Sequence, residues 1–206
     1  MSSLGDRVSV GQLVQRFLLP APLVSLVGLL RWGARISWRA EVELTSNLRL
    51  GPRNTISSFT KFKNAEGILR TGSDCGFATG CFVASGSGGI EFGDHVICGP
   101  NVAIIGGNYR YAALEVPFEE QGYFSVGVRI GRNVWIGANC TILDGSVIGD
   151  NTIVVPNSLV NRRFPPNVIL QGNPAKIVAR RGPGGGESGG QGAGASARAH
   201  DRQSGS

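Results

Sequence analysis

Hydrophobic and polar positions recur every six residues through much of the chain. From Val128 to Arg163 the sequence reads VRIGRN VWIGAN CTILDG SVIGDN TIVVPN SLVNRR. An aliphatic residue holds one position of each unit, and a small residue or valine follows four positions later. Glycine often comes directly after the aliphatic residue, and Asn or Asp falls where a tight corner is needed. The aliphatic positions are Ile130, Ile136, Ile142, Ile148 and Val154.

The same register extends towards the N-terminus and predicts further inward-facing residues. These are Trp38, Leu44, Leu50, Ile56, Phe62, Thr71, Phe77, Val83, Phe92, Cys98 and Ile104. The register slips near residues 64–68, at 87–89 and across 108–127. A six-residue period fits neither an amphipathic helix nor antiparallel hairpins. It predicts a parallel β-helix of about five to six stacked triangular coils, each made of three hexads.

Two flanking segments lack the repeat. Residues 17–30 form an apolar run of 14 residues, which is too short to cross a bilayer and is interrupted by Pro20 and Pro22. We expect a short helix here that caps the core, within an N-terminal region of residues 1–35. The alternative for residues 17–30 is a peripheral membrane contact. No small-residue cleavage site follows that would indicate a secretory signal.

The C-terminal segment, residues 182–206, contains no apolar residue larger than alanine. It cannot bury enough surface to offset the entropy of ordering, so we expect a disordered Gly/Ser-rich tail. The β-helix domain is therefore expected over residues 36–181. Its twenty-residue interruption, residues 108–127, is long enough to indicate a functional loop or a contact between copies.

Charge and cysteine content narrow the function. The net charge of +6 comes without a nucleic-acid-binding motif, so nucleic acid is not an expected partner. A late basic cluster is a candidate anion site: Arg162, Arg163, Lys176, Arg180 and Arg181. All four cysteines fall on predicted inward positions and form no C-x-x-C pair. They indicate small buried residues in a reducing cytoplasm rather than disulfides or zinc ligands.

Two stretches carry a resemblance to a known family: IGRNVWIGANCTILDGSVIGDN and FPPNVILQGNPAKIVARR. With them, residues 69–181 resemble the hexapeptide-repeat acyltransferases, and most of all the galactoside, maltose and capsular-polysaccharide O-acetyltransferases. The resemblance implies a left-handed parallel β-helix and a homotrimer. It also implies that acetyl-CoA lies in a groove between neighbouring prisms, completed by the loop 108–127. No metal is expected as a cofactor.

The resemblance also implies cofactor-binding residues. Ala138 matches a position whose backbone meets the thioester, and Pro156 and Asn157 match a pair that lines the pantetheine arm. Proline departs from the family there, because it removes an N–H donor. The other implied positions, which match residues that contact the cofactor or lie near its phosphates, are Asn161, Arg162, Lys176 and, one place out of register, Arg180.

The catalytic histidine of the family is missing. Gly107 stands at its position and Tyr109 at that of a second histidine, while His95 has the sequence context of a corner residue and His200 lies in the tail. Two histidines also argue against a three-histidine zinc site. Three interpretations remain: another base serves, positioning alone drives a slow transfer, or catalysis is lost. Candidate catalytic residues in the loop are Asn108, Tyr109, Glu119 and Glu120.

The sequence therefore predicts an acyl-CoA-dependent O-acyltransferase that acts on a hydroxyl of a sugar or saccharide precursor. The alternative is a catalytically inactive trimeric β-helix protein that serves in binding or assembly. Gly107, at the expected position of the catalytic histidine, favours the inactive protein. The residues that the resemblance assigns to the cofactor favour the acyltransferase.

Overall fold

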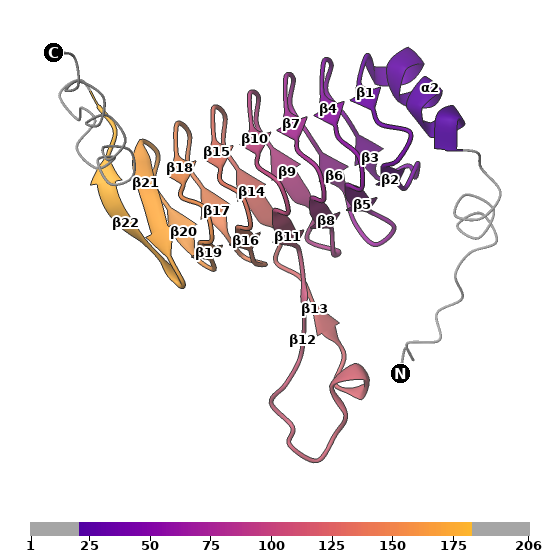
Figure 1. Ribbon diagram of the computed structural model, residues 1–206. Coiled ribbons are helices and arrows are strands. Elements are labelled where there is room, and N and C mark those ends of the chain that lie inside the picture. The colour runs from indigo at the N-terminus through magenta and orange to yellow at the C-terminus, as the bar shows by residue number, and fades with distance from the viewer. Residues whose placement is uncertain (1–20, 183–206) are drawn as a thin grey trace, which may run out of the picture.

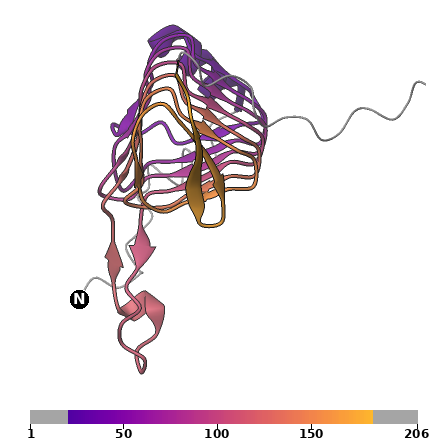
Figure 2. The same ribbon diagram turned by 90° about the vertical axis from the view of Figure 1, so that its left-hand side faces the viewer.

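The computed structural model describes residues 21–182. Within this range the chain winds into a three-sided prism of six complete coils, followed by a terminal hairpin (Figures 1 and 2). The prediction of a parallel β-helix of about five to six coils is confirmed. The predicted disordered tail lies outside the described residues apart from Gly182, and so do residues 17–20 of the apolar run.

Three parallel sheets form the faces of the prism, which we call faces A, B and C. Face A consists of β1 (Arg35–Ile36), β4 (Thr55–Ile56), β7 (Gly76–Phe77), β10 (Ile97–Cys98), β15 (Trp135–Ile136), β18 (Ile153–Val154) and β21 (Val168–Gly172). Face B consists of β2 (Glu41–Val42), β5 (Lys61–Lys63), β8 (Phe82–Ala84), β11 (Ala103–Ile105), β16 (Thr141–Ile142) and β19 (Leu159–Val160). Face C consists of β3 (Leu48–Arg49), β6 (Leu69–Arg70), β9 (Ile90–Phe92), β14 (Val128–Ile130), β17 (Val147–Ile148) and β20 (Arg163–Phe164).

Two antiparallel pairs and one helix complete the described structure. Strand β22 (Ala175–Arg180) folds back on β21 at the C-terminal end of face A. Strands β12 (Asn108–Tyr109) and β13 (Tyr123–Phe124) form the stem of a long loop that contains the 3₁₀ turn η1 (Phe118–Glu120). Helix α2 (Ala21–Trp32) lies at the N-terminal end beside β1 (Figure 1). It is too short to span a membrane, and no other helix of the described residues could do so.

The core is the inside of the prism, where each strand contributes an inward side chain. Three phenylalanines, one from each face, meet edge to face: the ring centroids of Phe62 and Phe77 are 4.9 Å apart, and those of Phe77 and Phe92 are 5.2 Å apart. Such contacts favour packing beyond the area they bury. The four cysteines of the sequence are buried and unpaired, as predicted.

Corners are tight because of two residue types. Asn133, Asn139, Asn151 and Asn157 adopt positive φ values between 54° and 62°, which asparagine tolerates better than most residues. Glycine follows many strands because neighbouring coils approach there. A Cβ on Gly137, for example, would come within 2.6 Å of the Pro156 ring. The asparagines of the repeat are thus explained by the positive φ of the corners, and its glycines by the close stacking of neighbouring coils.

Register irregularities gather at one edge of the prism. The chain passes from face B to face C at what we call the B/C corner, and the slips near residues 64–68, 87–89 and 108–127 all fall there. The first coil also has two extra residues at this corner, and therefore Ile36 and Val42 point inward. The prediction that Trp38 faces inward is wrong, since its side chain is exposed at the corner between faces A and B.

Candidate functional site

The long loop leaves the B/C corner of the fourth coil and projects away from the prism (Figures 1 and 2). Its stem pairs Asn108 with Phe124 and Tyr109 with Tyr123. The rings of Tyr109 and Tyr123 meet edge to face with centroids 5.5 Å apart. The two candidate residues Asn108 and Tyr109 therefore lie at the base of the loop, next to a tyrosine that sequence reasoning did not select.

Gly107, where the resemblance places the histidine of the family, is buried under the ring of Tyr123. A Cβ built on Gly107 would lie 2.6 Å from Cζ of Tyr123, well inside van der Waals contact. A histidine at residue 107 and the observed position of Tyr123 therefore exclude each other. The phenol of Tyr123 occupies the space beside the backbone that a larger residue at 107 would need.

The hydroxyl of Tyr123 stays protonated at neutral pH. Partial burial raises the pKa of Tyr123, and the carboxylates of Glu66 and Asp144 raise it further. The side chain is still 44% exposed, so a ligand can reach it. A protonated phenol donates a hydrogen bond, and it is a poor general base. At this place it can polarise a carbonyl or orient an acceptor hydroxyl.

Polar contacts hold the loop where it rejoins the prism and within its distal part. The carboxylate of Asp144 accepts hydrogen bonds from the amides of Val126 (2.9 Å) and Gly127 (2.6 Å) where the chain rejoins the prism. Further out, the amide group of Gln121 accepts from the Ala113 N–H at 2.9 Å and donates to the Val116 carbonyl at 2.7 Å. These bonds give the excursion a defined shape.

Glu119 and Glu120 lie in η1, on the distal part of the loop, and both are exposed. Among the described residues neither side chain has an ionic or hydrogen-bonding partner. Both carboxylates therefore face solvent within one copy of the chain. The fold of a single copy does not bring these two residues to Gly107.

Ala138, Pro156 and Asn157 lie together where the chain passes from face A to face B, which we call the A/B corner. The N–H of Asn157 donates to the Ala138 carbonyl at 2.9 Å. Among the described residues the N–H of Ala138 has no acceptor. An amide without a partner can donate to a carbonyl oxygen of a ligand. The role expected of Ala138 stays a prediction.

Lys176 and Arg180 both lie on β22, but at its two ends. Lys176 pairs with Gln171 near the A/B corner, whereas Arg180 pairs with Val168 at the far side of face A. Four residues of extended chain separate them by roughly 13 Å. Asn161 and Arg162 are exposed at the B/C corner of the last coil. The seven expected cofactor residues are thus divided between two edges and one face of the prism.

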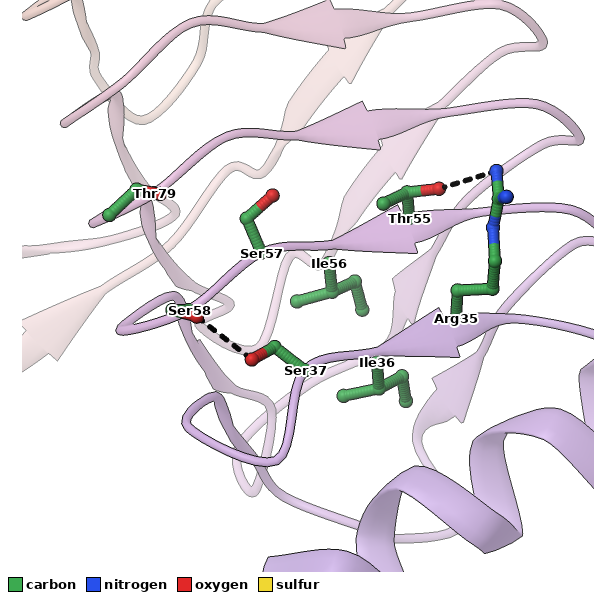
Figure 3. Close-up of a pocket in the computed structure, with 8 residues that line it drawn as sticks. All are labelled: Arg35, Ile36, Ser37, Thr55, Ile56, Ser57, Ser58 and Thr79. Carbon is green, nitrogen blue, oxygen red and sulfur yellow. Dashed lines mark hydrogen bonds between the residues drawn. The ribbon is translucent and has the colours of Figure 1, made fainter.

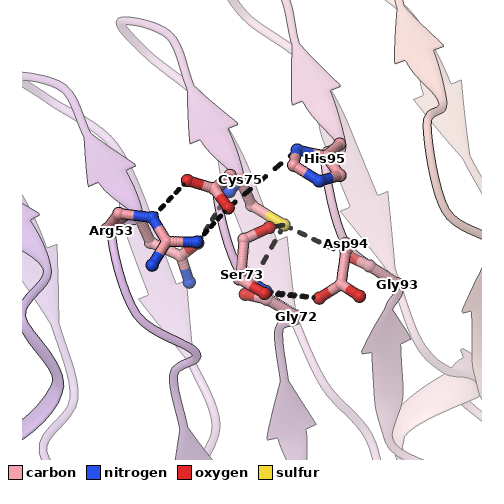
Figure 4. Close-up of polar contacts among 9 residues, drawn as sticks. Arg53, Gly72, Ser73, Cys75, Gly93, Asp94 and His95 are labelled. Carbon is pink, nitrogen blue, oxygen red and sulfur yellow. Dashed lines mark hydrogen bonds and ion pairs between the residues drawn. The ribbon is translucent and has the colours of Figure 1, made fainter.

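His95 lies on the third edge, where face C passes to face A, and it has the positive φ (57°) of a corner residue, as predicted. Its Nδ1 is 4.0 Å from Asp74, which accepts two hydrogen bonds from Arg53 at 2.6 and 2.7 Å (Figure 4). The hydrogen bond from Arg53 lowers the pKa of Asp74. These contacts among Arg53, Asp74 and His95 link neighbouring coils at an edge of the prism that does not carry the long loop. No group of three His, Cys, Asp or Glu residues in the range 21–182 could hold a metal ion.

Residues 127–162 match the family model described as bacterial transferase hexapeptide (six repeats). This segment of the chain carries the hexapeptide repeat. The matched segment runs from the end of the loop to the last coil, and it includes Ala138, Pro156, Asn157, Asn161 and Arg162.

The chain is similar to two curated proteins that are named acetyltransferases. It is 34% identical over 90 residues to the galactoside O-acetyltransferase of Escherichia coli, which covers 43% of each chain. It is 28% identical over 166 residues to a Mycobacterium tuberculosis protein named "probable acetyltransferase", which covers 81% of this chain and 55% of the relative. The chain therefore spans about half the length of these relatives.

Solved structures share the left-handed parallel β-helix. One is the D94A mutant of AntD, an N-acyltransferase from Bacillus cereus in complex with dTDP and coenzyme A. It has a TM-score of 0.66 and 19% identity, and the match covers 76% of this chain and 88% of that one. Another is a hexapeptide-repeat acetyltransferase from Vibrio cholerae complexed with acetyl-CoA, with a TM-score of 0.55 and 20% identity over 84% of each chain. These likenesses establish the fold.

Proposed function

We propose that this hexapeptide-repeat protein is an acyl-CoA-dependent O-acyltransferase that transfers an acetyl group to a hydroxyl of a saccharide or saccharide precursor. The observation that carries the proposal is the unpaired amide of Ala138 at the A/B corner. It lies on the same edge as Lys176, which adds a cation for the phosphates of coenzyme A. The names of the relatives, among them a galactoside O-acetyltransferase, support the same class.

In the proposed reaction an acceptor hydroxyl attacks the thioester carbonyl. The carbonyl oxygen takes the negative charge of the tetrahedral intermediate, and the amide of Ala138 donates a hydrogen bond to it. Collapse of the intermediate releases the coenzyme A thiol, which takes up the proton lost by the acceptor, and leaves an acetyl ester. Tyr123, held protonated, donates a hydrogen bond that orients the acceptor or the carbonyl.

We propose a homotrimer as the working form. The loop exposes large apolar side chains far from its own prism, with Leu114 94% and Phe118 64% exposed. Burying them against a neighbouring copy would be favourable. A neighbour's loop would then meet the A/B corner of the first copy, which would join the divided cofactor residues in one groove. This contact between copies would also determine whether Glu119 or Glu120 becomes buried enough to act as a base.

A peripheral membrane contact is a further part of the proposal. Helix α2 exposes Leu23, Leu26, Leu29 and Leu30. Residues 21–70 hold eight Lys and Arg against three Glu, whereas residues 71–182 hold eight of each sign. An apolar helix face beside a cationic region suits the surface of an anionic bilayer. The unpaired cysteines suit a reducing compartment, so we propose the cytoplasmic side of that membrane.

The rival function is a non-catalytic trimeric binding protein, and it is favoured by Gly107 at the position of the histidine. Purified protein mixed with acetyl-CoA and a panel of saccharides, with free thiol monitored, separates the two. Thiol release that depends on an acceptor supports the transferase. Binding of acetyl-CoA without thiol release from any acceptor supports the rival. Glu119→Gln and Glu120→Gln, tested singly, show whether either carboxylate serves: full activity in both variants removes them as bases.

A further inference from the structure

A shallow groove of about 500 Å³ crosses face A at the N-terminal coils (Figure 3). Its lining is rich in hydroxyl groups. Arg35 donates from Nη2 to the Thr55 hydroxyl at 3.2 Å, and the hydroxyls of Ser37 and Ser58 lie 2.9 Å apart. The remaining lining residues are Ile36, Ile56, Ser57 and Thr79.

The guanidinium of Arg35 keeps most of its donors available. It is exposed, and in the described part of the chain no carboxylate pairs with it. Ser57 and Thr79 make no hydrogen bond through their hydroxyls to any described residue. An exposed guanidinium without a carboxylate partner, in one groove with hydroxyls that have no partner among the described residues, is chemically matched to an anionic ligand that also carries hydroxyl groups.

Next to Thr55 the outward side of face A has a gap. The register places Gly76 between Thr55 and Ile97, and a Cβ on Gly76 would meet nothing within 4 Å. Glycine weakens a strand interior, and it often marks a place where a ligand approaches the backbone closely. Since no protein atom fills this space among the described residues, the backbone of β7 is open to a ligand.

Beyond the gap lies an apolar shelf. Ile97 is 56% exposed and Trp135, its partner on the next strand, is 52% exposed. Trp135 precedes the Ala138 turn on the same coil. Adjacent strands lie about 4.8 Å apart, so the row from Arg35 through Gly76 to Trp135 is roughly 19 Å long. The row runs from the hydroxyl-lined groove to the corner where the thioester is expected.

We propose that this row on face A is the acceptor subsite, and that it takes a saccharide carrying a negative charge. Arg35 binds the phosphate or carboxylate, and Ser57 and Thr79 bind sugar hydroxyls. The sugar ring passes over Gly76, and its apolar side lies on Ile97, with Trp135 one strand closer to the expected thioester. The inference rests on the proposed acyltransferase function, because it places the acceptor at the thioester end of the cofactor.

Binding and transfer are measured separately, so that the two proposals fail in different ways. Binding of glucose, glucose 1-phosphate and glucuronate to the full-length protein is followed by saturation-transfer NMR and titration. We expect at least one of the two anionic sugars to bind at least tenfold more tightly than glucose. Tighter binding of glucose 1-phosphate would identify a phosphate as the preferred charged group, and tighter binding of glucuronate would identify a carboxylate.

The decisive variant is Gly76→Val. Valine fits the open space and favours a strand, so the melting temperature should not fall. It should lower anionic-sugar affinity about tenfold and leave coenzyme A affinity unchanged. Arg35→Gln should lower the affinity equally and abolish the preference for charge. Gly76→Ala should have an intermediate effect. Arg70→Gln, an exposed arginine on face C, is the matched control and should change nothing.

The inference is overturned if neither anionic sugar binds better than glucose, or if Gly76→Val leaves that binding unchanged. It is equally overturned if Gly76→Val or Arg35→Gln changes the oligomeric state, because face A would then pack against another copy. If Gly76→Val loses sugar binding while the wild-type protein transfers no acetyl group, the subsite is upheld and the transferase function is rejected. Transfer with unaltered acceptor KM in Gly76→Val would uphold the transferase and reject the subsite.

Discussion

Gly107 lies directly beneath the phenol ring of Tyr123, so close that a Cβ at residue 107 would come within 2.6 Å of the Cζ atom. The two residues are sixteen positions apart in the sequence and meet through the pairing of β12 with β13. The absence of histidine at 107 and the presence of a phenol above it are therefore one structural feature.

Enlarging Gly107 should displace the stem of the loop. We expect Gly107→Ala to destabilise the protein by about 1–3 kcal/mol, as overpacking of a filled site does. The double variant Gly107→Ala with Tyr123→Ala should recover part of that loss, because the clashing ring is removed. Thermal denaturation of the four proteins in the cycle measures the coupling. Additive effects would show that the two side chains do not compete for space.

Removing the hydroxyl of Tyr123 should reduce acetyl transfer while leaving the fold intact. Loss of a donor to a developing charge typically costs about 10²-fold in kcat, and we expect this order for Tyr123→Phe. Because burial and nearby carboxylates raise the pKa of Tyr123, the wild-type rate should not decline through loss of this proton until pH exceeds about 10, the ordinary tyrosine value. Tyr111→Phe, on the exposed loop, is the control. Equal rates for Tyr123→Phe and wild type would remove Tyr123 from the mechanism.

The two cations of β22 should contribute unequally to cofactor binding. Lys176→Gln should weaken coenzyme A binding about tenfold, since a charge-assisted contact to phosphate is lost near the A/B corner. Arg180→Gln should have little effect, because Arg180 lies at the far side of face A. Isothermal titration calorimetry with coenzyme A gives both values. A stronger effect from Arg180 than from Lys176 would place the phosphates elsewhere.

The apolar tip of the loop should be needed for assembly. We expect Leu114→Asp and Phe118→Asp to shift a trimer towards monomers in analytical ultracentrifugation and to lower transfer activity in parallel. Both residues are exposed in one copy, so neither change should lower the melting temperature of the monomer. Glu115→Gln on the same loop is the control for a general loop effect. Trimers that persist in both aspartate variants would contradict the proposed role of the loop.

Helix α2 should bring the protein to anionic vesicles. We expect co-sedimentation with phosphatidylglycerol vesicles at low salt and none with phosphatidylcholine alone. Leu26→Ser combined with Leu30→Ser should abolish it, because both side chains are on the exposed part of the helix. Val178→Ser, an exposed apolar residue at the opposite end of the prism, is the matched control. Equal sedimentation of all variants would reject α2 as the contact.

Sequence and structure each decided a separate part of this protein. The six-residue pattern by itself determined the parallel β-helix, its number of coils, the buried cysteines and the corner asparagines, because each coil repeats the same local requirements. Only the tertiary structure decided that Trp38 faces outward, since two extra residues at one corner shift the register. It also decided that Gly107 meets Tyr123, and that Lys176 and Arg180 lie at opposite ends of one strand. The first contact depends on how the loop 108–127, which has no repeat, folds back on itself. The second depends on how β22 pairs with β21 on face A. Both are determined by contacts between residues that are distant in the sequence.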